Sequence, residues 1–321
     1  MGIIGGEVEL LKTTLNEYFT DSGRSSIRLI LENLKKKTFL IPNYLCEIIL
    51  KIFEDYKVNY SFYKINSDLS IDKSSIKNKH YDVIYIINYF GINHSIYEIV
   101  EPNNIVVEDN VFSPLFWNNN NFPNWIGFNS FRKISPLADG SLIKSTIPLP
   151  EDKIKNISPE FSKIKYSAKD KKYNFLKYNQ YSEKEYLDLF RIAENNLDRQ
   201  TWINKISSYS LFRLMDFLSG IEGEYKVRKN NYNLLYANLK DKAIELNTNY
   251  PSFFVISVEK RDELRNFLYT KEIYCPVHWP SIRGVLCQVN DKCLSIPIDS
   301  RYSRNDMLQI ASYINYFYDN K

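Results

Sequence analysis

The stretch Asp82-Val-Ile-Tyr-Ile-Ile-Asn88 decides the fold class of this 321-residue chain. Its unbroken apolar run, without polar alternation, is typical of a parallel strand that is covered on both faces of its sheet. A second run of this kind, Ile105-Val-Val-Glu-Asp109, follows a short distance downstream. Together the two runs predict neighbouring strands of a parallel sheet in an α/β protein.

Working outward, the periodicity predicts further strands and helices on both sides of these runs. Expected helices cover residues 7–19, 25–36, 44–56, 96–100, 183–198, 203–219, 225–246, 260–269 and 305–318. Expected strands cover residues 38–42, 58–65, 125–131, 141–144, 252–258, 273–278 and 293–298. Residues 148–177 are rich in Lys, Pro and Ser with weak periodicity, and we expect an exposed connection there. The prediction is a large domain over 1–200, with a mostly parallel seven-stranded sheet flanked by helices, and a smaller C-terminal α+β domain over 201–321.

Composition excludes several classes of protein. The 42 basic and 38 acidic residues give a net charge of +4, too balanced for a nucleic-acid partner. No run of eighteen apolar residues predicts a membrane span, and the N-terminus lacks the pattern of a signal peptide, so we expect a cytoplasmic protein. The four cysteines show no CxxC spacing and are interpreted as buried thiols. The three histidines are too scattered to predict a metal site.

Asp109 is the first candidate for chemistry, because it ends an apolar strand. A carboxylate in such a place is costly to bury unless a cation pairs with it. Enzymes use this arrangement to hold the protonated ring nitrogen of pyridoxal phosphate (PLP). A helix cap or a loop ion pair is the other interpretation.

Lys133 is the second candidate, in Ser130-Phe-Arg-Lys133, which follows a predicted strand and precedes a loop that contains Gly140. A partly desolvated lysine beside another cation, here Arg132, has a lowered pKa and becomes a competent amine nucleophile. The hydroxyl of Ser130 could bind a phosphate. An ordinary solvated lysine is the alternative.

The third candidate is the turn Ser22-Gly23-Arg24-Ser25, which opens a predicted helix. The free N–H groups and the dipole of a helix N-terminus favour a phosphate at Gly23, Arg24 and Ser25. The same residues also form an ordinary helix cap.

Taken in order, the phosphate turn, the Glu108-Asp109 strand end and Ser-x-Arg-Lys133 before Gly140 resemble the DegT/StrS-type aminotransferases. The similarity extends to Pro42-x-Tyr44. This family consists of fold-type-I PLP enzymes that mostly aminate keto groups of nucleotide-linked sugars. The resemblance implies a PLP transferase fold of type I, with a Schiff base on Lys133, Asp109 on the ring nitrogen and the phosphate at Arg24, Ser25 and Ser130.

The same resemblance implies a homodimer with shared active sites, a keto-sugar nucleotide as acceptor, and an amino donor such as glutamate. It offers Tyr89, His278, Arg228 and Asn231 as substrate-binding candidates. Two positions depart from the family. Cys46 stands where an aromatic ring usually stacks on the cofactor, so that Tyr44 or Tyr89 would have to replace it, and Phe112 stands where Gln or His is usual.

Two other functions stay open. One is a non-catalytic homologue that binds a sugar nucleotide or a protein partner, which the departures at Cys46 and Phe112 favour. The other is a PLP enzyme that acts on a small keto or amino compound. The sequence does not identify the sugar, the amino donor or the stereochemistry of amination.

Overall fold

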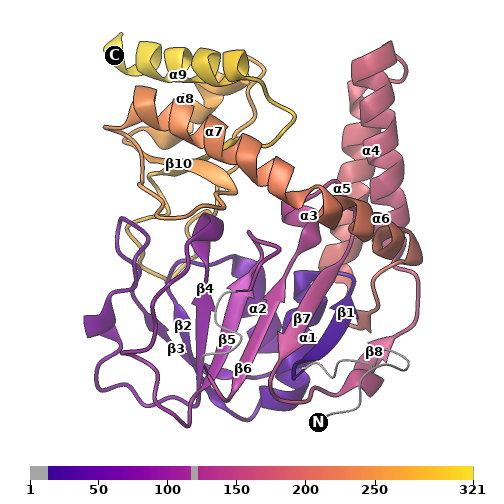
Figure 1. The fold of residues 1–321 in the computed structure, drawn as a ribbon, viewed down its shortest axis with the longest axis vertical. Coiled ribbons are helices and arrows are strands. Elements are labelled where there is room, and N and C mark those ends of the chain that lie inside the picture. The colour runs from indigo at the N-terminus through magenta and orange to yellow at the C-terminus, as the bar shows by residue number, and fades with distance from the viewer. Residues whose placement is uncertain (1–13, 117–121, 321) are drawn as a thin grey trace, which may run out of the picture.

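The computed structural model describes residues 14–116 and 122–320 and is built around one seven-stranded sheet (Figure 1). The strand order is β1-β7-β6-β5-β4-β2-β3. Strands β6, β5, β4, β2 and β3 run parallel, whereas β7 is antiparallel to both of its neighbours. The strands are β1 (Asn16–Thr20), β2 (Thr38–Pro42), β3 (Asn59–Tyr63), β4 (Val83–Ile87), β5 (Ile105–Asn110), β6 (Trp125–Asn129) and β7 (Ser141–Ser145). The expected mostly parallel sheet of seven strands is confirmed.

The centre of the sheet is apolar and its strand ends are polar. Every residue of β4 and β6 is buried, as the continuous apolar run predicted for β4. Helices α1 (Gly23–Leu34) and α2 (Glu47–Asp55) pack against each other on one face of the sheet. The polar residues Asn88, Asp109 and Asn129 gather where the parallel strands end. This edge is where α/β sheets hold their ligands.

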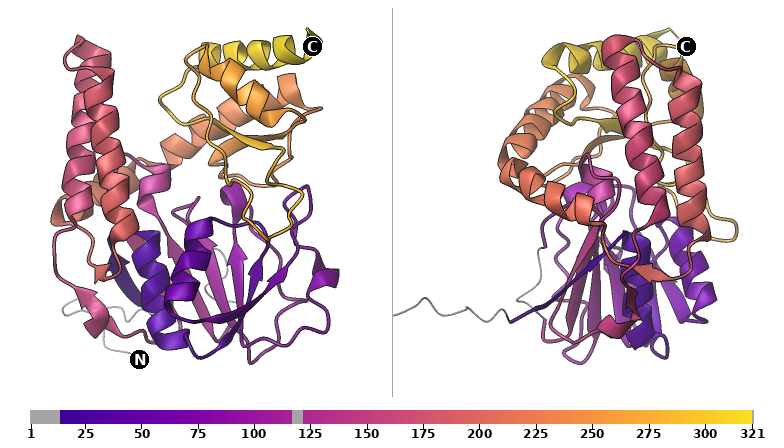
Figure 2. Two further views of the ribbon diagram at one scale, coloured as in Figure 1. Left: turned by 180° about the vertical axis from the view of Figure 1, so that it is seen from behind. Right: turned by 90° about the vertical axis from the view of Figure 1, so that its right-hand side faces the viewer.

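The rest of the chain rises from the same end of the sheet (Figures 1 and 2). The first part is a hairpin of α4 (Glu160–Tyr178) and α5 (Glu183–Arg199), with β8 (Ile154–Lys155) pairing to β9 (Ile203–Asn204) at its base. Helices α6 (Ser208–Ser219) and α7 (Ile221–Leu239) lead to a C-terminal layer. That layer holds the antiparallel pair β10 (Phe253–Ser257) and β11 (Cys293–Pro297) with α8 (Arg261–Tyr269) and α9 (Arg304–Asp319). Short turns of helix complete the chain: α3 (Phe131–Ile134), η1 (Lys73–Ser75), η2 (Tyr89–Gly91) and η3 (Glu151–Lys153).

One hydrophobic core runs from the large sheet into the C-terminal layer. Ile84 of β4, Phe254 of β10 and Leu294 of β11 belong to the same cluster of buried side chains. The division of the chain near residue 200 therefore stays a prediction. Among the described residues, no helix combines the length and the apolar character that a bilayer crossing requires.

Several expected elements differ from the structure. The helix expected over residues 7–19 is wrong where it can be seen, because residues 16–20 form β1; residues 1–13 lie outside the described part. Pairing with β7 stabilises a strand here, although the apolar residues of this segment have helical spacing. The expected helix over 96–100 is a turn, and the expected strand over 273–278 is irregular. The expected helix over 203–219 begins only at Ser208, after β9.

The largest error is the expected connection over residues 148–177, most of which is helix α4. Its own apolar periodicity is weak, and its stability comes from packing along α5. In proteins most helical stability comes from such tertiary packing rather than from propensity. The sequence of this segment alone therefore did not indicate a helix.

We expect Gly127→Ala to destabilise the protein by about 1–3 kcal/mol, the usual effect of overpacking a core. A Cβ at this position of β6 would lie 2.3 Å from the Trp125 ring and 2.8 Å from Phe116. Urea unfolding measures the change in the free energy of unfolding. The control is Gly223→Ala, because a Cβ in this part of α7 meets nothing within 4 Å. The control should be neutral or stabilise by up to about 1 kcal/mol; equal losses in both variants would contradict the packing argument.

Candidate active site

The neighbouring acids at the end of β5 point to opposite faces of the sheet, because side chains alternate along a strand. Glu108 accepts hydrogen bonds from Asn88 Nδ2 at 2.7 Å and from Trp125 Nε1 at 3.1 Å. Asp109 lies on the face that carries Tyr85, whose ring contacts Phe53 of α2. Of the two carboxylates, only Asp109 therefore faces the covering helices.

Asp109 is buried without a cationic partner in contact. It is 2% exposed, and it accepts hydrogen bonds from the Tyr85 hydroxyl at 2.6 Å and from the Val111 N–H at 3.0 Å. Burial raises its pKa to about 6, although these hydrogen bonds and the charge of Lys133 act against the rise. Among the described residues no ion pair includes Asp109. Such a carboxylate is suited to binding a cation.

Lys133 lies near Asp109 and has an activated amine. Its Nζ is 5.7 Å from the centroid of the Phe112 ring. Burial lowers the pKa of Lys133; the Cys46 thiol opposes this effect and Arg132 adds to it. The residue as a whole is exposed to solvent, whereas protein atoms surround its Nζ. A lysine with these two properties can act as a nucleophile toward a carbonyl compound.

The phosphate turn lies beside the other candidates. Ser22 caps α1 by accepting from the Ser25 N–H, which leaves the N–H groups of Gly23 and Arg24 without an acceptor among the described residues. A Cβ on Gly23 would lie 3.6 Å from Ser130 Cβ and 3.5 Å from Val111. The start of α1 therefore meets the ends of β5 and β6. Two amide donors and the hydroxyl of Ser130 are together available for an anion.

Two predicted phosphate ligands have side chains engaged elsewhere. The guanidinium of Arg24 pairs with Asp198 at 2.5 Å. The hydroxyl of Ser25 interacts with Asp21 and with Gln200. Burial also raises the pKa of Asp21 to about 6. The main chain of this turn is therefore better placed to bind a phosphate than these side chains, whose role stays a prediction.

His278 belongs to the same site, as an uncharged group. Its Nδ1 lies 2.9 Å from the Ser295 hydroxyl, and its ring contacts Phe112 with centroids 5.2 Å apart. Burial, and then the charge of Lys133, lower the pKa of His278 to about 3. The imidazole is therefore neutral at physiological pH, next to the candidate amine.

Tyr44 and Tyr89 pack into the core instead of standing free. Their ring centroids are 5.2 Å apart, and Tyr44 also contacts Trp279 at 5.4 Å. The Tyr89 hydroxyl donates to the carbonyl of Tyr44 at 2.5 Å. Cys46, two residues after Tyr44, is instead the group that interacts electrostatically with Lys133. A cofactor contact by either tyrosine stays a prediction.

The side chains of Arg228 and Asn231 donate hydrogen bonds to groups of the protein itself. Arg228 bonds Glu224 and the carbonyl oxygens of Ser252 and Ile134. Asn231 Nδ2 donates to two carbonyl oxygens of the loop before α9. Because Ile134 follows Lys133, Arg228 positions the end of α3. Substrate binding by these two residues stays a prediction.

The loop after Lys133 contains a glycine that its conformation requires and a feature that the sequence did not reveal. Gly140 has φ +115°, and a Cβ there would lie 2.7 Å from Ile206, so this position requires glycine. The unexpected feature is Asp139, a buried carboxylate that accepts from Ser162 and from both the N–H and the hydroxyl of Ser207. It joins the loop to the starts of α4 and α6. No local pattern could have revealed it, since its partners lie more than twenty residues away.

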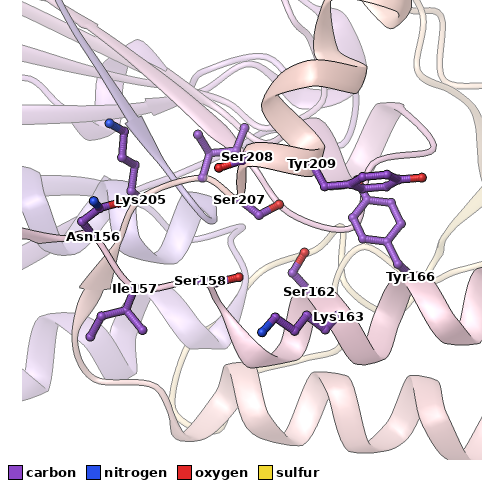
Figure 3. Close-up of a pocket in the computed structure, with 11 residues that line it drawn as sticks. Asn156, Ile157, Ser158, Ser162, Lys163, Tyr166, Lys205, Ser207, Ser208 and Tyr209 are labelled. Atoms are coloured by element: carbon purple, nitrogen blue, oxygen red, sulfur yellow. The ribbon is translucent and has the colours of Figure 1, made fainter.

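A cavity of about 570 Å³ lies apart from these groups, between β8, the start of α4 and the start of α6 (Figure 3). Lys163, Lys205 and Tyr209 are among its lining residues, whereas Lys133 and Asp109 are not. Its edge-to-face pair of rings, Tyr166 and Tyr209, has centroids 4.6 Å apart. The titratable groups with shifted pKa values that can act together lie around Lys133 instead, and this region is the candidate active site.

We expect Asp109→Asn to reduce the loss of stability of the cofactor-free protein between pH 4 and pH 7. The folded-state pKa, about 6, exceeds the ordinary 3.8, so the unfolded chain releases this proton first and stability falls as the pH rises. A shift of this size corresponds to about 3 kcal/mol at neutral pH. Urea unfolding at several pH values measures it. Asp21, whose pKa is also raised, should still make the free energy of unfolding fall as the pH rises, so part of the pH dependence should remain. A pH dependence equal to that of the wild type would contradict the assignment to Asp109.

No protein-family model and no curated protein matches the sequence. Solved structures do match its fold. A DegT/DnrJ/EryC1/StrS aminotransferase from Brucella abortus is 15% identical with a TM-score of 0.65, over 94% of this chain and 85% of that one. PseC, an aminotransferase of pseudoaminic acid biosynthesis from Helicobacter pylori, is 11% identical with a TM-score of 0.65, over 95% and 87%. The histidinol-phosphate aminotransferase from Clostridium acetobutylicum is 11% identical with a TM-score of 0.58, over 96% and 85%. The chain has the fold of the fold-type-I PLP-dependent aminotransferases.

Proposed function

We propose that this protein is a PLP-dependent aminotransferase, with Lys133 as the residue that bonds the cofactor. The observation that carries the proposal is the pair of an amine with a lowered pKa and a buried acid with a raised pKa. Each of the two side chains influences the pKa of the other, and no hydrogen bond joins them in the described residues. Environments that push two pKa values apart are typical of acid–base pairs in active sites.

The residues present fit PLP. Asp109 is a buried carboxylate that needs a cation, which the protonated ring nitrogen would provide. The N–H groups of Gly23 and Arg24 and the Ser130 hydroxyl would hold the phosphate. When bound, PLP supplies an aldehyde that reacts with amines and a ring that withdraws electrons.

Lys133 would also act as the general base. Burial lowers its pKa and so favours the neutral amine, whose Nζ can accept the proton that leaves the α-carbon of the amino donor. Tyr85 holds Asp109 in position through its hydroxyl. Neutral His278, next to Lys133, is available to bind a polar group of the substrate.

The proposed substrates are an amino donor such as glutamate and a keto-sugar nucleotide as acceptor. Support for the acceptor comes from the resemblance in the motifs and from solved structures of the same fold that are described as sugar aminotransferases. The four cysteines are free thiols, which supports the proposal that the protein works in the reducing cytoplasm.

A binding protein without catalysis is the second candidate function, and the departures from the family pattern at Cys46 and Phe112 favour it. Phe112 is fully buried and lies beneath the amine of Lys133. Production of 2-oxoglutarate from glutamate, in an amount equal to the enzyme when no acceptor is added, would exclude this candidate. A protein that binds PLP but makes no 2-oxoglutarate from glutamate would favour it.

We expect the purified protein to take up PLP in a form that borohydride reduction fixes to Lys133. Peptide mass spectrometry identifies the modified lysine, and absorbance measures the cofactor content. Lys133→Ala should abolish the attachment. The control Lys184→Ala, at an exposed position of α5, should leave it unchanged. A wild-type protein that takes up no PLP at saturating concentration would refute the proposed function.

The proposal includes a homodimer that forms through α6. Four large apolar residues on this helix are exposed: Leu211, Phe212, Met215 and Leu218. Phe212 is 74% and Met215 71% exposed, and the spacing of the four places them on one face. Exposed apolar patches of this kind mark interaction sites, and a second copy of the chain would cover the patch.

We expect Phe212→Glu to convert a dimer into a monomer, because a charge in an apolar interface loses its hydration. Light scattering coupled to size-exclusion chromatography measures the mass. The matched control is Leu176→Glu, at a position of α4 that is 69% exposed and away from α6. A wild-type monomer, or dissociation of both variants, would contradict the proposed interface.

A further inference from the structure

Helix α4 carries a row of lysines on one face. Lys165, Lys169 and Lys172 are four and three residues apart, the spacing that aligns side chains along a helix. We call these three residues the α4 cation row. They are partly buried, whereas Lys163 and Lys177, which lie outside the row on α4, are exposed. The row is about 10 Å long at 1.5 Å per residue.

The row begins next to the proposed active site. Lys165 and Arg132 both bond the same atom, Oε1 of Glu194, and Arg132 directly precedes Lys133. Burial alone would raise the pKa of Glu194, but its two cationic partners lower it to about 2. This carboxylate is therefore ionised, and it already pairs with two cations at the lower end of the row.

The upper end of the row has positive neighbours and lacks a carboxylate in contact. Lys169 and Lys172 each interact unfavourably with Arg301, which pairs bidentately with Asp299. Within the described residues, no ion pair includes Lys169 or Lys172. Burial and then Arg301 lower the pKa of Lys169 to about 8. Arg301 belongs to the loop before α9, so the row is near the C-terminal layer that stands beside α4 in Figure 1.

This arrangement is costly for the protein alone. Glu194 pairs with Lys165 and Arg132, and Asp299 pairs with Arg301, whereas Lys169 and Lys172 form no ion pair within the described residues. Glu194 and Glu183 act on these two lysines only from a distance. Partly buried like charges destabilise a fold unless an anion compensates them. Surface lysines would avoid the cost by turning to solvent, as Lys163 and Lys177 do.

We propose that the α4 cation row, together with Arg301, binds the diphosphate group of the acceptor substrate. The inference rests on the proposed function and deepens it, because it assigns the anionic part of the acceptor to a particular helix. A carboxylate of the amino donor would also be attracted to cations, but one carboxylate needs one cation. A row of cations about 10 Å long suits two linked phosphates, each with its own negative charge.

The experiment is a calorimetric titration of the PLP-loaded protein with inorganic pyrophosphate, with uridine diphosphate and with glutamate. Lys169→Gln and Lys172→Gln should each weaken binding of both diphosphates by about tenfold, the effect of one charge-assisted hydrogen bond. Binding of glutamate should not change. The matched control Lys177→Gln removes the same charge from an exposed position of α4 outside the row and should leave all three affinities within about twofold.

Thermal unfolding without ligand separates binding from structure. Because Lys169 is surrounded by like charge, Lys169→Gln should keep or raise the melting temperature while it weakens diphosphate binding. A lower melting temperature together with weaker binding would indicate a structural role and would overturn the inference. Unchanged diphosphate affinity, or a loss confined to glutamate, would overturn it as well. Failure of the proposed function is recognised separately, as a protein that contains no PLP.

Discussion

The hydrogen bond from the Tyr85 hydroxyl to the buried carboxylate of Asp109 is the contact around which the site is arranged. It joins neighbouring strands β4 and β5 at their carboxyl ends, on the face that α1 and α2 cover. A buried acid without a cation is a cost that folding alone does not explain. The cost becomes intelligible when the position is a binding site for a positively charged ring nitrogen.

The rest of the structure brings an amine and an anion site to this acid. Lys133 stands on one short turn of helix, which would be mobile if it were isolated. Arg228 holds the end of that turn through the Ile134 carbonyl, and Asp139 fixes the loop that follows by bonding the starts of α4 and α6. Gly140 allows the loop to pass close to Ile206. The position of the amine therefore depends on residues from helices far along the chain.

The helical hairpin of α4 and α5 adds the electrostatic part of the site. Glu194 of α5 pairs with Arg132, the neighbour of Lys133, and with Lys165 of α4. A single carboxylate thus connects the proposed cofactor lysine to the cation row. The same hairpin supplies Asp198, which engages Arg24 at the phosphate turn. Cofactor and substrate groups would therefore be coordinated by one appended element rather than by the sheet alone.

The sequence by itself determined the parallel strands β4 and β5, the helix after the Ser-Gly turn, and the candidates Asp109 and Lys133. These features are local: an apolar run, a cap and the polar residue at the end of a strand are visible in a few consecutive residues. Only the tertiary structure decided that residues 16–20 pair as a strand and that residues 160–178 form a helix, because the stabilising partners lie in β7 and α5. It also decided that Arg228 supports the fold around Lys133, that Glu194 pairs with Arg132 and that Asp139 bonds Ser207. Contacts between distant residues give these side chains their roles, and such contacts leave no local pattern in the chain.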